Sequence, residues 1–122
     1  MKDSTNKTFN HFKIHTQYSI CEGAIKIEQL KDYCKTNKIQ SLGISDTHIL
    51  SGALEFSETL SSIGTQPIIG TQILFKYKNF TGLIPLIAKN SSGYKNIIDL
   101  SSKSYLDNSE DTDPHCSFDD LL

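Results

Sequence analysis

The chain has 122 residues, 37% of them hydrophobic and 9% aromatic, which is enough for one domain with a modest core. No apolar run approaches the roughly 18 residues of a membrane-spanning helix, and residues 1–10 lack the apolar stretch of a signal peptide, so we expect a cytoplasmic chain with no membrane partner. The chain contains no arginine and its formal net charge is −2, which argues against this segment binding nucleic acid by itself.

Hydrophobic periodicity predicts alternating strands and helices along the chain. In chain order they are a strand at 11–15, a helix at 24–37, a strand at 41–45, a helix at 52–63, a strand at 67–70 that 72–77 extends or turns into a hairpin, a strand at 83–88 and a helix at 91–104. The widely spaced Cys21, Cys34 and Cys116 contain no CxxC pair and are expected to be free thiols.

Strand, helix, strand, helix, strand at this spacing predicts an α/β fold with a parallel sheet. The first turn, residues 16–23, lacks the GxGxxG of a dinucleotide-binding fold. Polar residues fall instead at predicted strand ends, namely His15, Asp46 and Gln72, as in a (β/α) barrel. A complete barrel takes about 250 residues, so we expect roughly its first half, with one unpaired sheet edge.

Three basic side chains share one face of the first predicted strand. His11, Lys13 and His15 are separated by two residues each, and side chains alternate along a strand. Two imidazoles with Asp46 from the next strand end and Glu55 from the following helix are a ligand set typical of a metal site. The alternative interpretation is a polar barrel mouth with solvated histidines.

Four sequence blocks occur in one order along residues 9–106. They are FNHFKIHTQYSICEGAIKIEQL, SLGISDTHILSGALEF, QPIIGTQILF and LIPLIAKNSSGYKNIIDLSSKSYL. Together they resemble the N-terminal PHP (polymerase and histidinol phosphatase) domain of the bacterial DNA polymerase III alpha subunit. The resemblance implies a partial PHP-type distorted (β/α) barrel over 9–106, a flexible N-terminus over 1–8, and an acidic loop or tail over 107–122 that can begin the next PHP segment.

The resemblance also implies metal positions, residue by residue. His11, His15, Asp46 and Glu55 match family ligands. Lys13, Thr47 and Gln72 stand where the family has a His, a His and a Glu, and His48 falls one place beyond the ligand position. The predicted site is therefore vestigial, with no catalytic residue and no cofactor in this chain; zinc, manganese or magnesium would bind only if the site were still competent.

A lysine in the space of a metal ion suggests how the old site is neutralised. We expect the Lys13 ammonium to pair with Asp46 or Glu55, because buried carboxylates need a partner. Replacing Lys13 with Met is then expected to destabilise the fold.

The resemblance implies a role in DNA replication, with a structural or docking function for this segment. The complete family member is a DNA-directed DNA polymerase, a nucleotidyltransferase, whereas these 122 residues lack its acidic palm domain. The implied partners are the rest of the alpha chain and a proofreading exonuclease, with DNA reached only through the full-length polymerase. The alternatives are a metal-dependent phosphoesterase and a non-catalytic α/β interaction module.

Overall fold

A computed structural model describes residues 9–19, 23–109 and 111–122. Its elements in chain order are α1 (Ile27–Asn37), β1 (Ser41–Thr47), α2 (Ala53–Ser61), β2 (Gln66–Tyr77), β3 (Phe80–Ile87), α3 (Ser91–Leu106), β4 (Cys116–Ser117) and the short 3₁₀ helix η1 (Phe118–Leu121). The α/β class predicted from the sequence is confirmed. The expected flexible terminus at 1–8 and the thiol of Cys21 lie outside the described residues.

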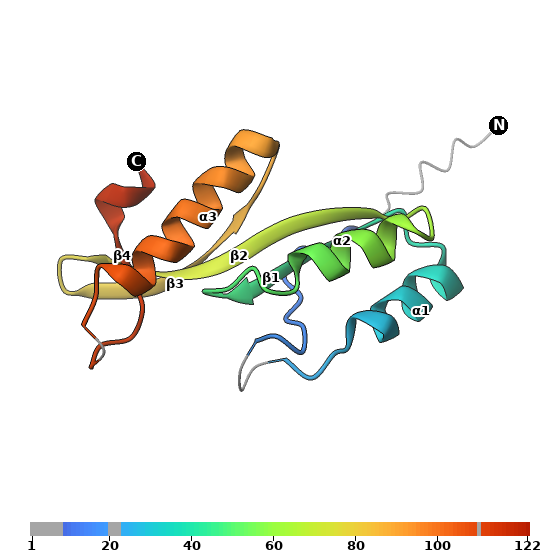
Figure 1. The fold of residues 1–122 in the computed structure, drawn as a ribbon, viewed down its shortest axis with the longest axis horizontal. Coiled ribbons are helices and arrows are strands. Elements are labelled where there is room, and N and C mark those ends of the chain that lie inside the picture. Colours follow the sequence, from blue (N-terminus) through green and yellow to red (C-terminus); the bar gives the residue numbers. More distant parts are fainter. Residues whose placement is uncertain (1–8, 20–22, 110) are drawn as a thin grey trace.

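The strand β2 organises the sheet (Figure 1). β1 pairs with it in parallel from Ser41↔Gln66 to Thr47↔Gln72, and the two-residue β4 pairs in parallel further along. β3 returns antiparallel against the other edge of β2. The parallel sheet expected from the sequence is wrong at β3, because the turn between β2 and β3 is too short for a parallel crossover. Residues 72–77 extend the strand, which is one of the two alternatives left open. The partial (β/α) barrel stays a prediction.

One hydrophobic cluster joins α1 and α2 to the first half of the sheet. Its buried side chains recur at helical spacing and continue into β1: Ile27, Leu30, Cys34, Leu42, Ile44, Phe56 and Leu60. α1 begins where the Lys26 N–H donates to Gln29 Oε1 at 3.0 Å, and it ends at Asn37, which is followed by the cap residue Lys38 with a φ of +52°. Cys34 is a free buried thiol, as expected, and burial raises its pKa.

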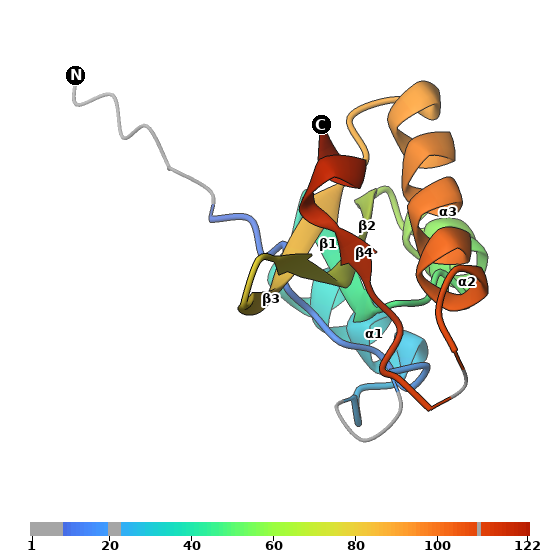
Figure 2. The ribbon, with the colours of Figure 1, turned by 90° about the vertical axis from the view of Figure 1, so that its left-hand side faces the viewer.

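A second cluster fixes α3 and the C-terminal segment to the far half of β2. Ile73, Phe75 and Cys116 form its buried centre, and Leu100 of α3 and Leu121 of η1 pack against it. In the view of Figure 2, α2 and α3 lie on the same side of the sheet. β2 contributes side chains to both clusters, because Ile69 packs against the first and Ile73 and Phe75 belong to the second.

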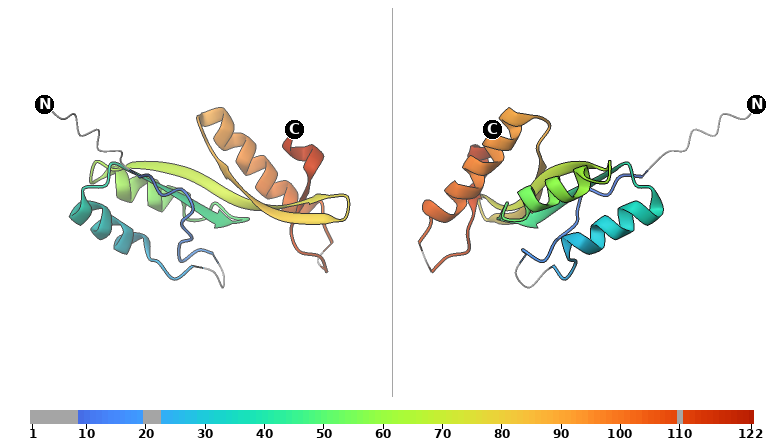
Figure 3. Two further views of the ribbon diagram at one scale, coloured as in Figure 1. Left: turned by 180° about the vertical axis from the view of Figure 1, so that it is seen from behind. Right: turned by 45° about the vertical axis from the view of Figure 1, so that its right-hand side comes forward.

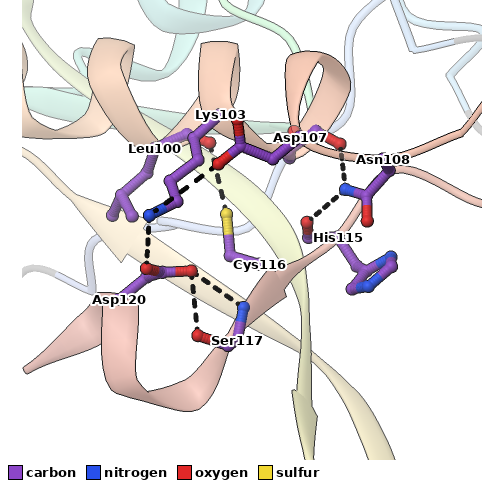
Figure 4. A network of polar contacts seen from close by, with 9 residues as sticks. Leu100, Lys103, Asp107, Asn108, His115, Cys116, Ser117 and Asp120 are labelled. Carbon is purple, nitrogen blue, oxygen red and sulfur yellow. Dashed lines mark hydrogen bonds and ion pairs between the residues drawn. The ribbon is translucent and has the colours of Figure 1, made fainter.

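The segment 107–122, expected to be a loop or tail, contains β4 and η1 and is held by polar contacts (Figure 4). Lys103 Nζ on α3 donates to Asp120 Oδ1 at 2.6 Å, and Ser117 donates to Asp120 Oδ2 from both N and Oγ at 3.0 Å. The hydrogen bond from Lys103 holds the pKa of Asp120 below its ordinary value. Cys116 Sγ donates to the Leu100 carbonyl at 3.3 Å, and burial raises the pKa of this free thiol.

The strand predicted at 11–15 is wrong. Residues 9–15 follow the edge of β1, where the Gly43 N–H donates to the His11 carbonyl and the Ser45 N–H donates to the Ile14 carbonyl. These contacts span two residues of β1 but three of the segment, so the regular alternation of a ladder is lost. The segment is visible along the sheet in both views of Figure 3.

Within the described part of the chain, no helix combines the length and the apolar character needed to cross a membrane.

Candidate functional site

The carboxylate of Asp46, at the carboxyl end of β1, is the centre of a buried polar cluster. Asp46 is 1% exposed. Its Oδ1 accepts from the Thr16 N–H at 2.6 Å and from Ser19 Oγ at 2.8 Å, and its Oδ2 accepts from Thr16 Oγ1 at 2.7 Å. Three donors on two oxygens satisfy a buried carboxylate that would otherwise be costly to desolvate.

The donors come from one tight turn at residues 16–19. The Ser19 N–H donates to the Thr16 carbonyl at 3.0 Å, and the Tyr18 N–H donates to Thr16 Oγ1 at 3.3 Å. The backbone of Gly23 lies so close to Thr16 that a Cβ there would be 1.7 Å from the Thr16 carbonyl oxygen. This turn therefore needs a glycine at 23 and presents its hydroxyls to β1.

Glu55 on α2 is engaged separately. The Tyr18 hydroxyl donates to Glu55 Oε2, and this hydrogen bond raises the pKa of Tyr18, with desolvation and the carboxylate charge acting in the same direction. The ring of Tyr18 lies over the start of α2, where a Cβ at Gly52 would be 2.7 Å from its Cδ2. Tyr18 thus ties the first turn to α2.

The two predicted imidazole ligands lie in different surroundings. His11 is exposed, packs edge-on against Phe9 at 4.7 Å, and lines an apolar groove beside α1 of about 320 Å³. His15 is half-buried and directly precedes Thr16. Lys13, between them, is exposed. Because residues 11–15 form no strand, regular alternation no longer places the three side chains on one face.

The predicted ion pair of Lys13 with Asp46 or Glu55 is absent from the described residues, and this expectation is wrong. The oxygens of Asp46 accept from Thr16 and Ser19, and Glu55 accepts from Tyr18. Neutral hydroxyl and amide donors perform the role that the sequence assigned to an ammonium.

The other substituted positions are register partners: Thr47 is the last residue of β1, and Gln72 lies opposite it within β2. Thr47 is half-buried, and its N–H donates to Ser19 Oγ at 3.3 Å. Gln72 is 3% exposed, and its Oε1 has no hydrogen-bond partner in the described part of the structure. His48 turns away toward α3: its φ is +62°, its ring lies edge-on to Tyr105, and its carbonyl accepts from Ser101 Oγ at 2.6 Å.

These positions do not fit a divalent ion. Among residues 9–19, 23–109 and 111–122, no group of three His, Cys, Asp or Glu side chains is placed to hold a metal. Asp46 already accepts three hydrogen bonds and Gln72 offers a neutral amide oxygen, so the cluster lacks the convergent anionic and imidazole donors that zinc or manganese requires.

Three hydroxyl residues of this cluster were not among the predicted site residues. Thr16 and Ser19 carry the donors to Asp46, and Thr71 Oγ1 on β2 donates to the carbonyls of Asp46 and Ile49 at 2.7 and 3.1 Å. Hydroxyl residues are common in loops, so only their position beside predicted strand ends was available as a signal.

Comparison with known proteins gives a consistent result. The family model described as "PHP domain" matches residues 11–122. The chain is 35% identical over 115 residues to "DNA polymerase III subunit alpha" of Rickettsia conorii and 35% identical over 123 residues to that of Caulobacter vibrioides, each covering 93% of this chain. The subunit of Helicobacter pylori is 34% identical over 110 residues and covers 84%. The chain spans about a tenth of these relatives: 10%, 11% and 9%.

Proposed function

We propose, because this chain belongs to the PHP domain family, that it is the amino-terminal PHP portion of a DNA polymerase III alpha subunit. In this proposal it serves DNA replication as a structural segment. The similarity to alpha subunits supports the replicative part of this proposal, because it extends over 84–93% of the chain.

The hydrogen bonding of Asp46 carries the structural part of the proposal. A metal-dependent hydrolase needs carboxylate oxygens that face an ion and an open coordination position for water. Asp46 instead accepts from the Thr16 amide, the Thr16 hydroxyl and the Ser19 hydroxyl, at 1% exposure. In this proposal the old ligand position has become a clamp that holds the first turn against β1.

The metal site is thus degenerate, and zinc, manganese or magnesium is not a resident cofactor. The substitutions at Lys13, Thr47 and Gln72 support this view from the sequence, since they remove two imidazoles and one carboxylate at positions that resemble family ligands. A metal-dependent phosphoesterase is the alternative, and the saturation of Asp46 argues against it.

Nucleotidyl transfer belongs to the remainder of the alpha chain in this proposal. Such chemistry uses metal-bound acidic residues, which the described residues do not gather. The remainder of the alpha chain is the first partner, a proofreading exonuclease is a second, and DNA is reached through the complete polymerase.

Metal analysis combined with restored ligands tests the proposal. The purified chain is expected to carry no stoichiometric zinc or manganese and to leave p-nitrophenyl phosphate intact. The triple variant Lys13→His, Thr47→His, Gln72→Glu, incubated with the same metals, tests whether these substitutions silence the site. Stoichiometric metal with phosphatase turnover in the unmodified chain would refute the structural role.

The replicative role needs a separate measurement. Joined to the remainder of the alpha chain, Asp46→Ala is expected to lower the melting temperature and the DNA polymerase activity together, because it removes the acceptor of three hydrogen bonds. Glu58→Ala, at an exposed position of α2, is the matched control. An Asp46→Ala polymerase with unchanged melting temperature and activity would contradict the proposal.

A further inference from the structure

Lysines and exposed aromatic rings gather at the turn between β2 and β3. β2 ends at Tyr77 and β3 begins at Phe80, so Lys78 and Asn79 form a two-residue turn, which lies at the left-hand end of the molecule in Figure 1. Tyr77 and Phe80 are register partners, so their rings share one face of the hairpin. They are 51% and 75% exposed. We call residues 76–80 the hairpin tip.

The aromatic face of the hairpin tip continues onto η1. The Phe118 ring lies edge-on to the Tyr77 ring with the two centroids 5.3 Å apart, and Lys78 Nζ lies 5.3 Å from the centre of the Tyr77 ring. A groove of about 270 Å³ separates the tip from the start of η1. Its lining residues are Lys76, Tyr77, Lys78, Ser117, Phe118 and Asp119.

The turn itself does not explain the lysine at position 78. The φ of Lys78 is +53°, in the left-handed region that favours glycine and asparagine. Lys78 is exposed, and it makes no ion pair with a carboxylate within residues 9–19, 23–109 and 111–122. A cation placed at this position against the preference of the backbone indicates a role for its charge outside the fold.

The charge around the hairpin tip differs from that of the whole chain. Residues 59–98 contain four lysines and no aspartate or glutamate, although the formal net charge of the chain is −2. Lys76 is exposed and, like Lys78, forms no salt bridge in the part of the chain that the structure describes. Among the lining residues, Asp119 on the η1 side carries a negative charge. The hairpin side of the groove therefore attracts anions.

We infer that the hairpin tip binds single-stranded nucleic acid, with bases stacked on Phe80 and Tyr77 and phosphates held by Lys76 and Lys78. Surfaces that bind single strands without sequence preference combine cations that follow the backbone with aromatic rings on which any base can stack. The choice of DNA as this strand rests on the proposed function. Two lysines give a weak contact, which adds to the DNA binding of the complete polymerase.

Fluorescence anisotropy of a short fluorescein-labelled oligo(dT), titrated with the 122-residue chain at low salt, tests the inference. Two phosphate contacts on a single strand predict that the logarithm of the association constant falls with the logarithm of the salt concentration with a slope of about −1.4. Phe80→Ala is expected to weaken binding about tenfold, because it removes a stacking surface.

Two charge variants make the test specific to the hairpin tip. Lys78→Asn keeps a residue suited to the positive φ, so it is expected to reduce the salt slope to about −0.7 without lowering the melting temperature. Asp119→Asn is expected to strengthen binding, because it removes a negative charge from the groove. Tyr94→Ala and Lys95→Gln remove an exposed ring and an exposed lysine from α3, and as matched controls they are expected to bind like the unmodified chain.

Three outcomes would overturn the inference. They are no binding at low salt, equal binding by the unmodified chain and the Phe80→Ala and Lys78→Asn variants, and binding to phosphatidylserine vesicles without binding to oligo(dT). Each leaves the proposed function standing, because the Asp46→Ala measurement on the joined polymerase does not depend on the hairpin tip.

Discussion

The substitution Thr16→Val removes the hydroxyl that donates to Asp46 and that also accepts a longer hydrogen bond, at 3.3 Å, from the Tyr18 N–H. Valine has nearly the shape of threonine, so the change removes the hydroxyl and leaves little cavity. The lost donor lies 2.7 Å from Asp46 Oδ2, and both residues are almost fully buried, at 0% and 1% exposure. The Thr16 amide and the Ser19 hydroxyl still donate to the other oxygen.

A hydrogen bond to a charged group contributes about 1.5–3 kcal/mol, and a buried acceptor left without its donor incurs a desolvation cost of similar size. We therefore expect Thr16→Val to lower the free energy of unfolding by about 2 kcal/mol. Ser19→Ala removes the donor at 2.8 Å and is expected to cost a similar amount, with the double variant non-additive because both bonds end on one carboxylate.

The assay is urea-induced unfolding followed by far-UV circular dichroism at pH 7. Thr81→Val is the control, because Thr81 is exposed on β3 and the same atom change there is expected to alter the free energy of unfolding by less than about 0.5 kcal/mol. If Thr16→Val were as mild as this control, the clamp on Asp46 would not stabilise the fold, and the structural interpretation of the site would be wrong.

Three further predictions concern other parts of the molecule. Because Lys103 holds the pKa of Asp120 below its ordinary value, this contact stabilises the fold above the unfolded-state pKa of about 3.9 and is lost as pH falls through the lower folded-state pKa; the difference in melting temperature between wild type and Asp120→Asn should therefore vanish in acid, and a difference independent of pH would count against the contact. Phe56→Ala is expected to lower the free energy of unfolding in urea by about 3–5 kcal/mol, because the ring is 0% exposed. Leu54→Ala, at a 70% exposed position of the same helix, is the control, and a Phe56→Ala effect as small as that of Leu54→Ala would contradict the core assignment. Lys13→Met, at an exposed position, should change the free energy of unfolding by less than about 0.5 kcal/mol, and a larger loss would restore the ion-pair hypothesis.

The helices were predictable because their buried positions recur at helical spacing. Ala53, Phe56 and Leu60 of α2 lie within the predicted 52–63, and α3 begins at the predicted Ser91, where the Asn90 side chain accepts from the Gly93 N–H at 2.8 Å. The strands β1 and β2 followed from their continuous apolar runs. Helical spacing, caps and apolar runs all depend on residues close together in the chain, so they can be recognised in a single sequence.

The edge segment and the site depend on distant contacts and were predicted less well. The alternation of residues 11–15 indicates a strand. The backbone takes a different path, because the Thr16 N–H and hydroxyl donate to Asp46, thirty positions away along the chain. For the same reason Lys13 was predicted to pair with Asp46 or Glu55, whereas the oxygens of Asp46 accept from Thr16 and Ser19. Sequence spacing gives the chemical groups near strand ends, whereas which donor reaches which oxygen is decided by the turn.

The contribution of β2 to both hydrophobic clusters has a consequence for folding during synthesis. The α1–α2 cluster and the first half of β2 are encoded before residue 73, so they can assemble while later residues are still on the ribosome. The other half of β2 must wait until Cys116 has emerged, because that residue completes the cluster beneath α3. If the ribosome paused after residue 73 and before Cys116 had emerged, the side chains of Ile73 and Phe75 would stay exposed to water. Chaperone binding to the nascent chain would prevent aggregation most effectively during this interval.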